Sequence, residues 1–146
     1  MSSIQFDPQA TGARSATLSF SGAPDNAQPT VTLKGTGELP VTLSTSAMAF
    51  GGETLFTPAA AKTVTVTNNT SSSITTLAFN VIGTNPGDFS PPTLATTCGA
   101  TLGAHSSCKV TIQFDPQAAG PRSATLAFSG TPDATQPSVA LTGTGK

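Results

Sequence analysis

The stretch CKVTIQFDP, residues 108–116, decides the fold class because apolar and polar residues alternate along it. Its apolar residues, which would share one face, are Cys108, Val110, Ile112 and Phe114. A period of two residues predicts a half-buried β-strand. The strand should end at Asp115 and Pro116, because proline has no N–H to donate to the ladder of a sheet.

Similar alternation continues on both sides of this stretch. The composition is rich in Thr, Ser, Gly, Pro, Ala and Val, which favours strands and turns over helices. We predict further strands at residues 41–50, interrupted in the middle, and at residues 63–67, 74–81, 124–128 and 139–141. A pattern of seven short strands in about 105 residues is typical of an immunoglobulin-like antiparallel sandwich, with a β-barrel as the alternative all-β architecture.

Part of this pattern occurs twice in the chain. Residues 4–37 align with residues 112–145 at a constant offset of 108, and nine of the 34 aligned positions differ, so 25 are identical. An offset of this size is the length of one sandwich domain. We therefore predict that residues 38–146 form one complete immunoglobulin-like domain. Residues 1–37 would be a partial repeat, the last three strands of a preceding, near-identical unit in a tandem array.

The partial repeat predicts an apolar face without a partner. The chain holds two copies of the last three strands but one copy of the first four. The predicted assembly face consists of Ile4, Phe6, Ala16, Leu18, Phe20, Val31 and Leu33. Two such faces could pair about a two-fold axis, the segment could exchange with residues 111–145 within the chain or in a neighbour, or it could stay disordered. We expect association, because exposed apolar patches with open sheet edges promote it.

The low charge argues against several classes of function. Charged residues make up 9% of the chain and the net charge is −1, so no basic surface is expected to attract nucleic acid. No apolar run approaches the length of a membrane-spanning helix, so direct membrane insertion is not expected. No nucleophile–base pair or metal-ligand cluster is visible, and we predict no enzyme activity, no catalytic or metal site and no cofactor.

The two cysteines, Cys98 and Cys108, predict a disulfide. Cys108 lies on the inward face of its strand, and Cys98 precedes it across a short loop. Two buried thiols are the alternative, whereas a zinc site would need more ligands than these sulfurs and His105 supply. Closing a loop of about 11 residues would stabilise the domain by roughly 2–3 kcal/mol in an oxidising compartment. Asp88 and the other aspartates stand apart beside Pro, Gly or Asn, which favours turns over calcium binding.

Five co-linear motifs carry a family resemblance. They are TVTNNT at residues 65–70, GTNPGDFS at 83–90, CG at 98–99 with SSC at 106–108, FDP at 114–116 with RSATL at 122–126, and LTGTG at 141–145. Together they resemble the repeats of the bacterial choice-of-anchor D and ASPM–SPD-2–Hydin (ASH) families. The resemblance implies a seven-stranded sandwich in multi-domain, often exported bacterial proteins, without enzymatic activity. His105 departs from the usual glycine, and Asp7 and Asp115 replace a common threonine.

The repeat and the resemblance together favour a structural function. We expect a spacer or stalk module of an extracellular or cell-surface bacterial protein, with copies of itself or neighbouring repeats as partners. One alternative is a self-assembling subunit that dimerises, exchanges strands or polymerises into a filament through its incomplete N-terminal half. Another is an adhesion module that binds a second surface protein. The absence of Trp and Tyr argues against a sugar-binding platform.

Overall fold

The computed structural model describes residues 3–22, 28–90, 96–133 and 135–146. The chain divides into two compact units, Met1–Leu39 and Pro40–Lys146. This division lies two residues after the boundary that the repeat predicts.

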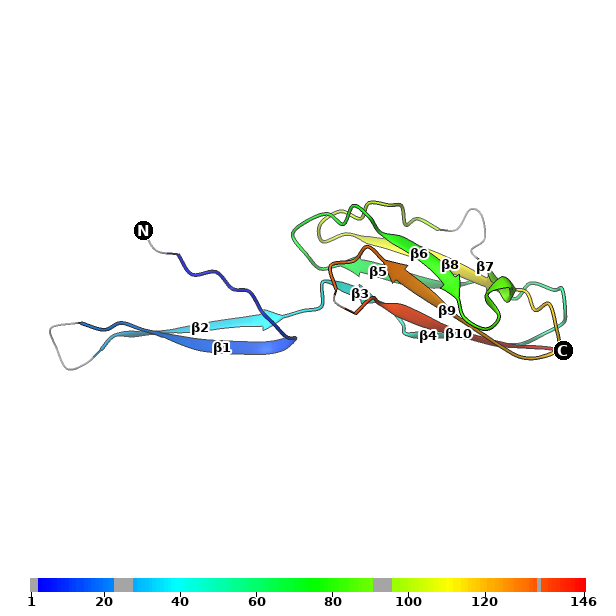
Figure 1. Ribbon diagram of the computed structural model, residues 1–146, viewed down its shortest axis with the longest axis horizontal. Helices are drawn as coiled ribbons and strands as arrows, with labels where there is room; N and C mark the ends of the chain where they lie inside the picture. Colours follow the sequence, from blue (N-terminus) through cyan, green and yellow to red (C-terminus); the bar gives the residue numbers. More distant parts are fainter. Residues whose placement is uncertain (1–2, 23–27, 91–95, 134) are drawn as a thin grey trace. The chain divides into compact units, whose positions relative to one another are not determined.

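The second unit is a sandwich of two four-stranded sheets. One sheet has the order β4 (Ala47–Glu53), β10 (Ser138–Gly145), β9 (Gly120–Ser129), β6 (Ala78–Ile82). The other has the order β3 (Val41–Leu43), β5 (Lys62–Asn68), β8 (Ser107–Phe114), β7 (Phe89–Ser90), and a 3₁₀ turn, η1 (Pro86–Asp88), leads into β7. The longer strands of both sheets run along one common direction (Figure 1), as in aligned sandwiches. The prediction of an all-β, immunoglobulin-like sandwich is confirmed.

The strand pattern differs from the prediction in three details. β10 pairs with β4 in parallel, so this sheet is mixed rather than wholly antiparallel. The interrupted first strand divides between the sheets as β3 and β4. The described part of residues 40–146 holds eight strands rather than seven, because β7 lies outside the predicted strand ranges. Residues 74–77 precede β6 instead of belonging to it, and Ile74 forms an isolated bridge with Leu102. The two parts of the divided strand are edge strands, β3 in one sheet and β4 in the other.

The core lies between the sheets and is built by the alternation of apolar residues. Ile112 and Phe114 of β8, Leu126 of β9, and Val139 and Leu141 of β10 are all fully buried. Successive side chains of a strand point to opposite faces, so each strand sends every second residue into this layer. The alternating residues of the sequence are therefore the residues that hold the two sheets together.

An aromatic cluster fills part of this core. Phe114 stacks on Phe89 with ring centroids 4.8 Å apart, and it packs against Phe50 at 5.8 Å. Gly143 lies beneath the Phe114 ring, where an added Cβ would collide with the ring. Aromatic pairs at such distances stabilise a core beyond the area that they bury. Phe114 is therefore one of the most tightly held side chains of the domain.

The first unit is an antiparallel hairpin of β1 (Gly12–Ser19) and β2 (Thr30–Gly37). The prediction of a third strand at its start is wrong for the described residues, because residues 3–8 adopt no strand. The counterpart segment, residues 112–114, ends β8, which pairs with β5 on one side and with β7 on the other. The first unit contains no counterpart of β5 or β7 among its described residues. A segment without a neighbouring strand forms no ladder of hydrogen bonds.

Candidate functional site: the apolar face of the first hairpin

The first hairpin repeats the pairing of β9 and β10 position for position. β1 and β2 pair over eight positions, beginning with Gly12 opposite Gly37. β9 and β10 pair over the same eight positions at the offset of 108, beginning with Gly120 opposite Gly145. Register decides which side chains share a face of a hairpin. The two hairpins therefore present equivalent residues on the same side.

The local packing of the hairpin is also reproduced. A Cβ added to Gly35 would collide with the ring of Phe6, just as a Cβ added to Gly143 would collide with Phe114. Phe6 therefore lies over β2 in the way that Phe114 lies over β10, although residues 4–6 form no strand. The Phe6 ring is thus already placed against β2, which lowers the conformational entropy that this side chain loses when the segment associates.

The predicted assembly face is exposed to solvent. We call it the hairpin face, and its members are Ile4, Phe6, Ala16, Leu18, Phe20, Val31 and Leu33. Ile4 and Phe6 are 59% and 52% exposed, and Phe20 and Val31 are each 47% exposed. Ala16 is exposed, whereas Leu18 and Leu33 are half-buried. Ala16 lies opposite Leu33, and Leu18 lies opposite Val31, so these four side chains share one side of the hairpin.

Each member of the hairpin face has an identical counterpart in the core of the second unit. The counterparts are Ile112, Phe114, Ala124, Leu126, Phe128, Val139 and Leu141, and none is more than 7% exposed. They are buried against the described part of residues 40–111, and we call residues 40–111 the framework. Burying apolar surface stabilises by roughly 25 cal/mol per Å². The hairpin face thus carries side chains that the second copy uses as core.

Three charged side chains, Asp7, Arg14 and Lys34, lie with this apolar surface. A groove of about 640 Å³ on the first unit is lined by Arg14 together with Ile4, Asp7 and Leu33. The Nε of Arg14 donates to the carbonyl of Ala10 at 3.3 Å. Within the part of the chain that the structure describes, Arg14 forms no ion pair. Its guanidinium therefore keeps donors that no carboxylate of the described residues satisfies.

Arg122, the counterpart of Arg14, has a carboxylate partner. Its Nε lies 2.5 Å from Oδ2 of Asp88 at the end of η1. Asp88 is 4% exposed, so the pair is largely removed from water. Breaking such a pair from one side leaves an uncompensated buried charge. The sequence predicts a turn at Asp88 but not this ion pair. One signal for the pair is present in the sequence, because Arg122 lies in phase with the inward residues of its strand.

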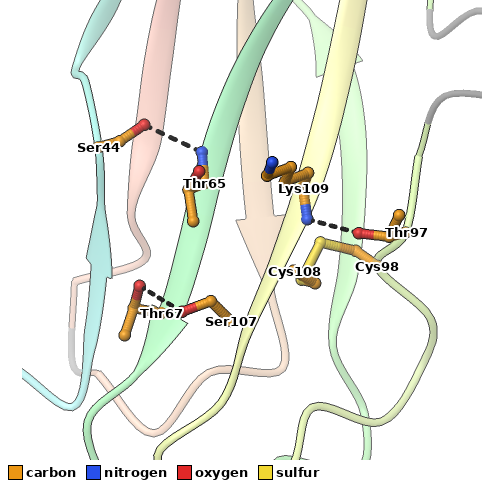
Figure 2. Close-up of a disulfide and its surroundings, with 8 residues drawn as sticks. All are labelled: Ser44, Thr65, Thr67, Thr97, Cys98, Ser107, Cys108 and Lys109. Carbon is orange, nitrogen blue, oxygen red and sulfur yellow. Dashed lines mark hydrogen bonds between the residues drawn. A yellow bond between two sulfur atoms is a disulfide. The ribbon is translucent and has the colours of Figure 1, made fainter.

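The structure joins Cys98 and Cys108 in a disulfide, with Cα atoms 4.9 Å apart. Cys108 is buried in the core, and Cys98 packs against it. Figure 2 shows the preceding residue, Thr97, beside β8, where the amide of Lys109 donates to Thr97 Oγ1 at 2.8 Å. The amide of Thr97 in turn donates to the carbonyl of Lys109 at 2.8 Å. Hydrogen bonds and a covalent bond thus hold this segment against the same strand.

The other residues considered from sequence do not converge on a site. His105 is exposed with a φ of 50°, a region that favours glycine, which is the usual residue at this position of the resembled repeats. Among the described residues, no group of three His, Cys, Asp or Glu side chains could hold a metal ion. The described residues also contain no helix long and apolar enough to span a membrane.

Comparison with solved structures places this geometry among known folds. No protein-family model matches the sequence, and no curated protein matches it. The chain is similar to the ASH / PapD-like domain 7 of human CEP192, with a TM-score of 0.50 and 15% identity over 78% of this chain and 92% of that chain. The fold is that of an ASH-like immunoglobulin domain.

A second similar structure belongs to a much larger protein. It is a family 123 glycoside hydrolase from Clostridium perfringens, with a TM-score of 0.53 and 5% identity over 69% of this chain. The matched region is 23% of the length of the hydrolase chain. At such low identities both comparisons describe the fold alone.

Proposed function

We propose that this chain is a non-catalytic structural module of a tandem-repeat surface or secreted protein, in which it acts as a spacer. One observation carries the proposal: the hairpin face is exposed, and every one of its seven residues is identical to a core residue of the second unit. An exposed surface that consists of typical core side chains is expected to be buried against a partner. In an array, the last hairpin of each repeat would close the sandwich begun by its own framework.

The first hairpin cannot replace β9 and β10 within its own chain. β10 runs parallel to β4 and brings Gly145 beside Glu53, whereas β3 lies at the opposite end of the sandwich from the C-terminus (Figure 1). β4 alone covers about 20 Å at ~3.3 Å per residue. The link from Gly37 to Val41 reaches about 14 Å when fully extended. The connection is therefore too short for β2 to occupy the place of β10.

Exchange between chains also leaves the apolar surface uncovered. Each chain has two copies of the hairpin but one framework. When the first hairpin of one chain displaces β9 and β10 of another, the displaced hairpin exposes the same residues. The number of exposed faces stays the same, so no hydrophobic gain drives the exchange. This stoichiometry favours a neighbouring repeat as the partner.

The hydroxyl groups along β5 and β8 suit a passive module. Thr63 and Thr111 form a hydroxyl–hydroxyl hydrogen bond at 2.9 Å across β5 and β8, and Thr67 and Ser107 form another at 2.9 Å. Polar groups that satisfy one another offer less to a ligand. The disulfide is compatible with an oxidising, extracellular location.

A self-assembling subunit is the second candidate, because the hairpin face could instead pair with a second copy of itself. Light scattering after size-exclusion chromatography distinguishes the two functions. Concentration should be measured by refractive index, since the chain has no Trp or Tyr. A spacer requires the full chain and a truncated chain of residues 38–146 to stay monomeric at all concentrations. A full chain whose mass rises with concentration, beside a monomeric truncation, would replace the spacer proposal by self-assembly.

The adhesion alternative predicts a different result. A protein-binding module would retain a partner through the second unit, so residues 38–146 would bind as well as the full chain. A spacer would bind no surface protein through this unit. The truncated chain therefore serves in both comparisons.

A further inference from the structure

We infer that the hairpin face receives the framework of a preceding repeat, and that Arg14 selects for an acidic side chain at the position of Asp88 in that framework. The inference rests on the proposed array and adds the chemistry of the partner. The chain itself contains the reference complex, because β9 and β10 are seated on residues 40–111.

The apolar part of the match follows from identity. The hairpin face and its buried counterparts carry the same seven side chains in the same register. Complementary packing at the density of a protein interior depends on the shape of each side chain. A surface complementary to β9 and β10 is therefore complementary to β1 and β2.

The charged part of the match is more selective. In the second unit, Arg122 meets Asp88, which the turn η1 places just before the buried Phe89. In the first unit, Arg14 contacts the Ala10 carbonyl, and no described carboxylate pairs with it. Docking an apolar framework without an acid would bury the guanidinium uncompensated, which is costly. A framework with an acid at this position gains a charge-assisted hydrogen bond instead.

The backbone of the docked state can also be specified. Residues 4–6 would continue the strand of the incoming framework, as residues 112–114 continue β8. The carbonyl of Phe114 accepts a hydrogen bond from the amide of Ala59 at 2.7 Å, and that of Pro116 accepts one from Phe56 at 3.0 Å. The counterparts, Phe6 and Pro8, would accept from the same positions of the partner. The missing third strand of the first unit thus forms upon docking.

The test extends the full chain with its own framework. A second copy of residues 38–111 is joined to Ile4, so that Thr111 of the copy precedes Ile4 as Thr111 precedes Ile112. Amide hydrogen exchange of β1 is then compared between the extended and the original chain. The inference expects exchange in β1 to slow by about 100-fold or more, because the hairpin becomes part of a cooperative domain. Exchange that stays as fast as in the original chain would overturn the inference.

A double-mutant cycle tests the role of Arg14. In the extended chain, Arg14→Gln and Asp88→Asn in the added copy should each speed the exchange of β1 by about tenfold or more. The double variant should lose less than the product of the two effects, because both remove one interaction. In the original chain, Arg14→Gln should leave the exchange of β1 unchanged. If the effects of the two substitutions on exchange are additive in free energy, Arg14 does not select for an acidic side chain. The docking of the framework on the hairpin face would still stand.

Failure of this inference differs from failure of the proposed function. If the amides of β1 exchange as fast in the extended chain as in the original chain, and the original chain is monomeric, the docking geometry is rejected but the spacer function is not. Protection of β1 in the original chain that increases with concentration identifies a second copy as the occupant. That outcome overturns both the inference and the spacer.

Discussion

Replacing Phe114 and Phe6 by alanine, one at a time, compares the same substitution in two environments. The two residues are related by the repeat, and each ring covers a glycine of its own hairpin. Phe114 is fully buried, whereas Phe6 is 52% exposed. Burial of a Phe side chain removes at least about 150 Å² from water, worth about 4 kcal/mol at ~25 cal/mol per Å². Phe114→Ala should therefore lower the free energy of unfolding of the sandwich by about 4 kcal/mol, inside the usual range of roughly 3–5 kcal/mol.

Phe6→Ala should leave this transition unchanged within about 0.5 kcal/mol, because Phe6 belongs to the other unit. Unfolding in urea followed by far-ultraviolet circular dichroism measures both variants without Trp or Tyr. In thermal unfolding, the Phe114→Ala loss should lower the Tm by roughly 15–30 °C for a domain of this size. The milder pair Ile112→Val and Ile4→Val should differ by about 1 kcal/mol in the same direction.

Equal losses for Phe114→Ala and Phe6→Ala would refute this reasoning. They would mean that Phe6 is buried in the same cooperative unit as the sandwich, or that a second molecule covers it. Dilution separates these cases, because an effect caused by association disappears at low concentration.

Three further predictions concern the second unit. Reduction of the Cys98–Cys108 disulfide should lower the free energy of unfolding by roughly 2–3 kcal/mol, and the reductant should have no effect on a variant with serine at both positions. Asp88→Asn should destabilise the sandwich by about 3 kcal/mol in urea unfolding; adding Arg122→Gln should cost little more, and a fully additive loss would show that the two side chains act separately. Burial raises the pKa of Asp133, so the stability that its protonated form contributes is present below the ordinary pKa of ~3.9 and is lost as the pH rises through the raised value. Asp133→Asn should therefore be more stable than the native chain at neutral pH and equally stable in acid. Thermal unfolding of both proteins at the two pH values measures this, and a stability difference that is the same at both would contradict the prediction.

The alternation of apolar and polar residues predicted the strands in which every second side chain is buried. The stretch around β8 shows this best, because Val110, Ile112 and Phe114 are fully buried. Alternation reports which side of a strand faces the core, and it does so without reference to any other strand. The same local signal began β6 too early, because Ile74 is buried without belonging to that strand.

Pairings between distant segments were beyond the reach of such patterns. The parallel pairing of β10 with β4 joins residues about ninety positions apart, and the contact of Arg122 with Asp88 joins residues 34 positions apart. The residues next to Asp88 in the sequence do not indicate its partner. The neighbouring proline and glycine predict a turn and nothing more. Only the packing of η1 against β9 brings the two charges together.

The sequence by itself determined that this protein is made of β-strands, which faces of the strands are apolar, and that the last of them occur twice. These properties follow from side-chain period and from identity, both of which are local. Tertiary structure decided which copy of those strands is buried. Residues 112–114 are part of a strand and residues 4–6 are not, although both read Ile-Gln-Phe. The difference lies in the neighbours: a strand exists through hydrogen bonds to other strands, and the framework supplies them to one copy alone.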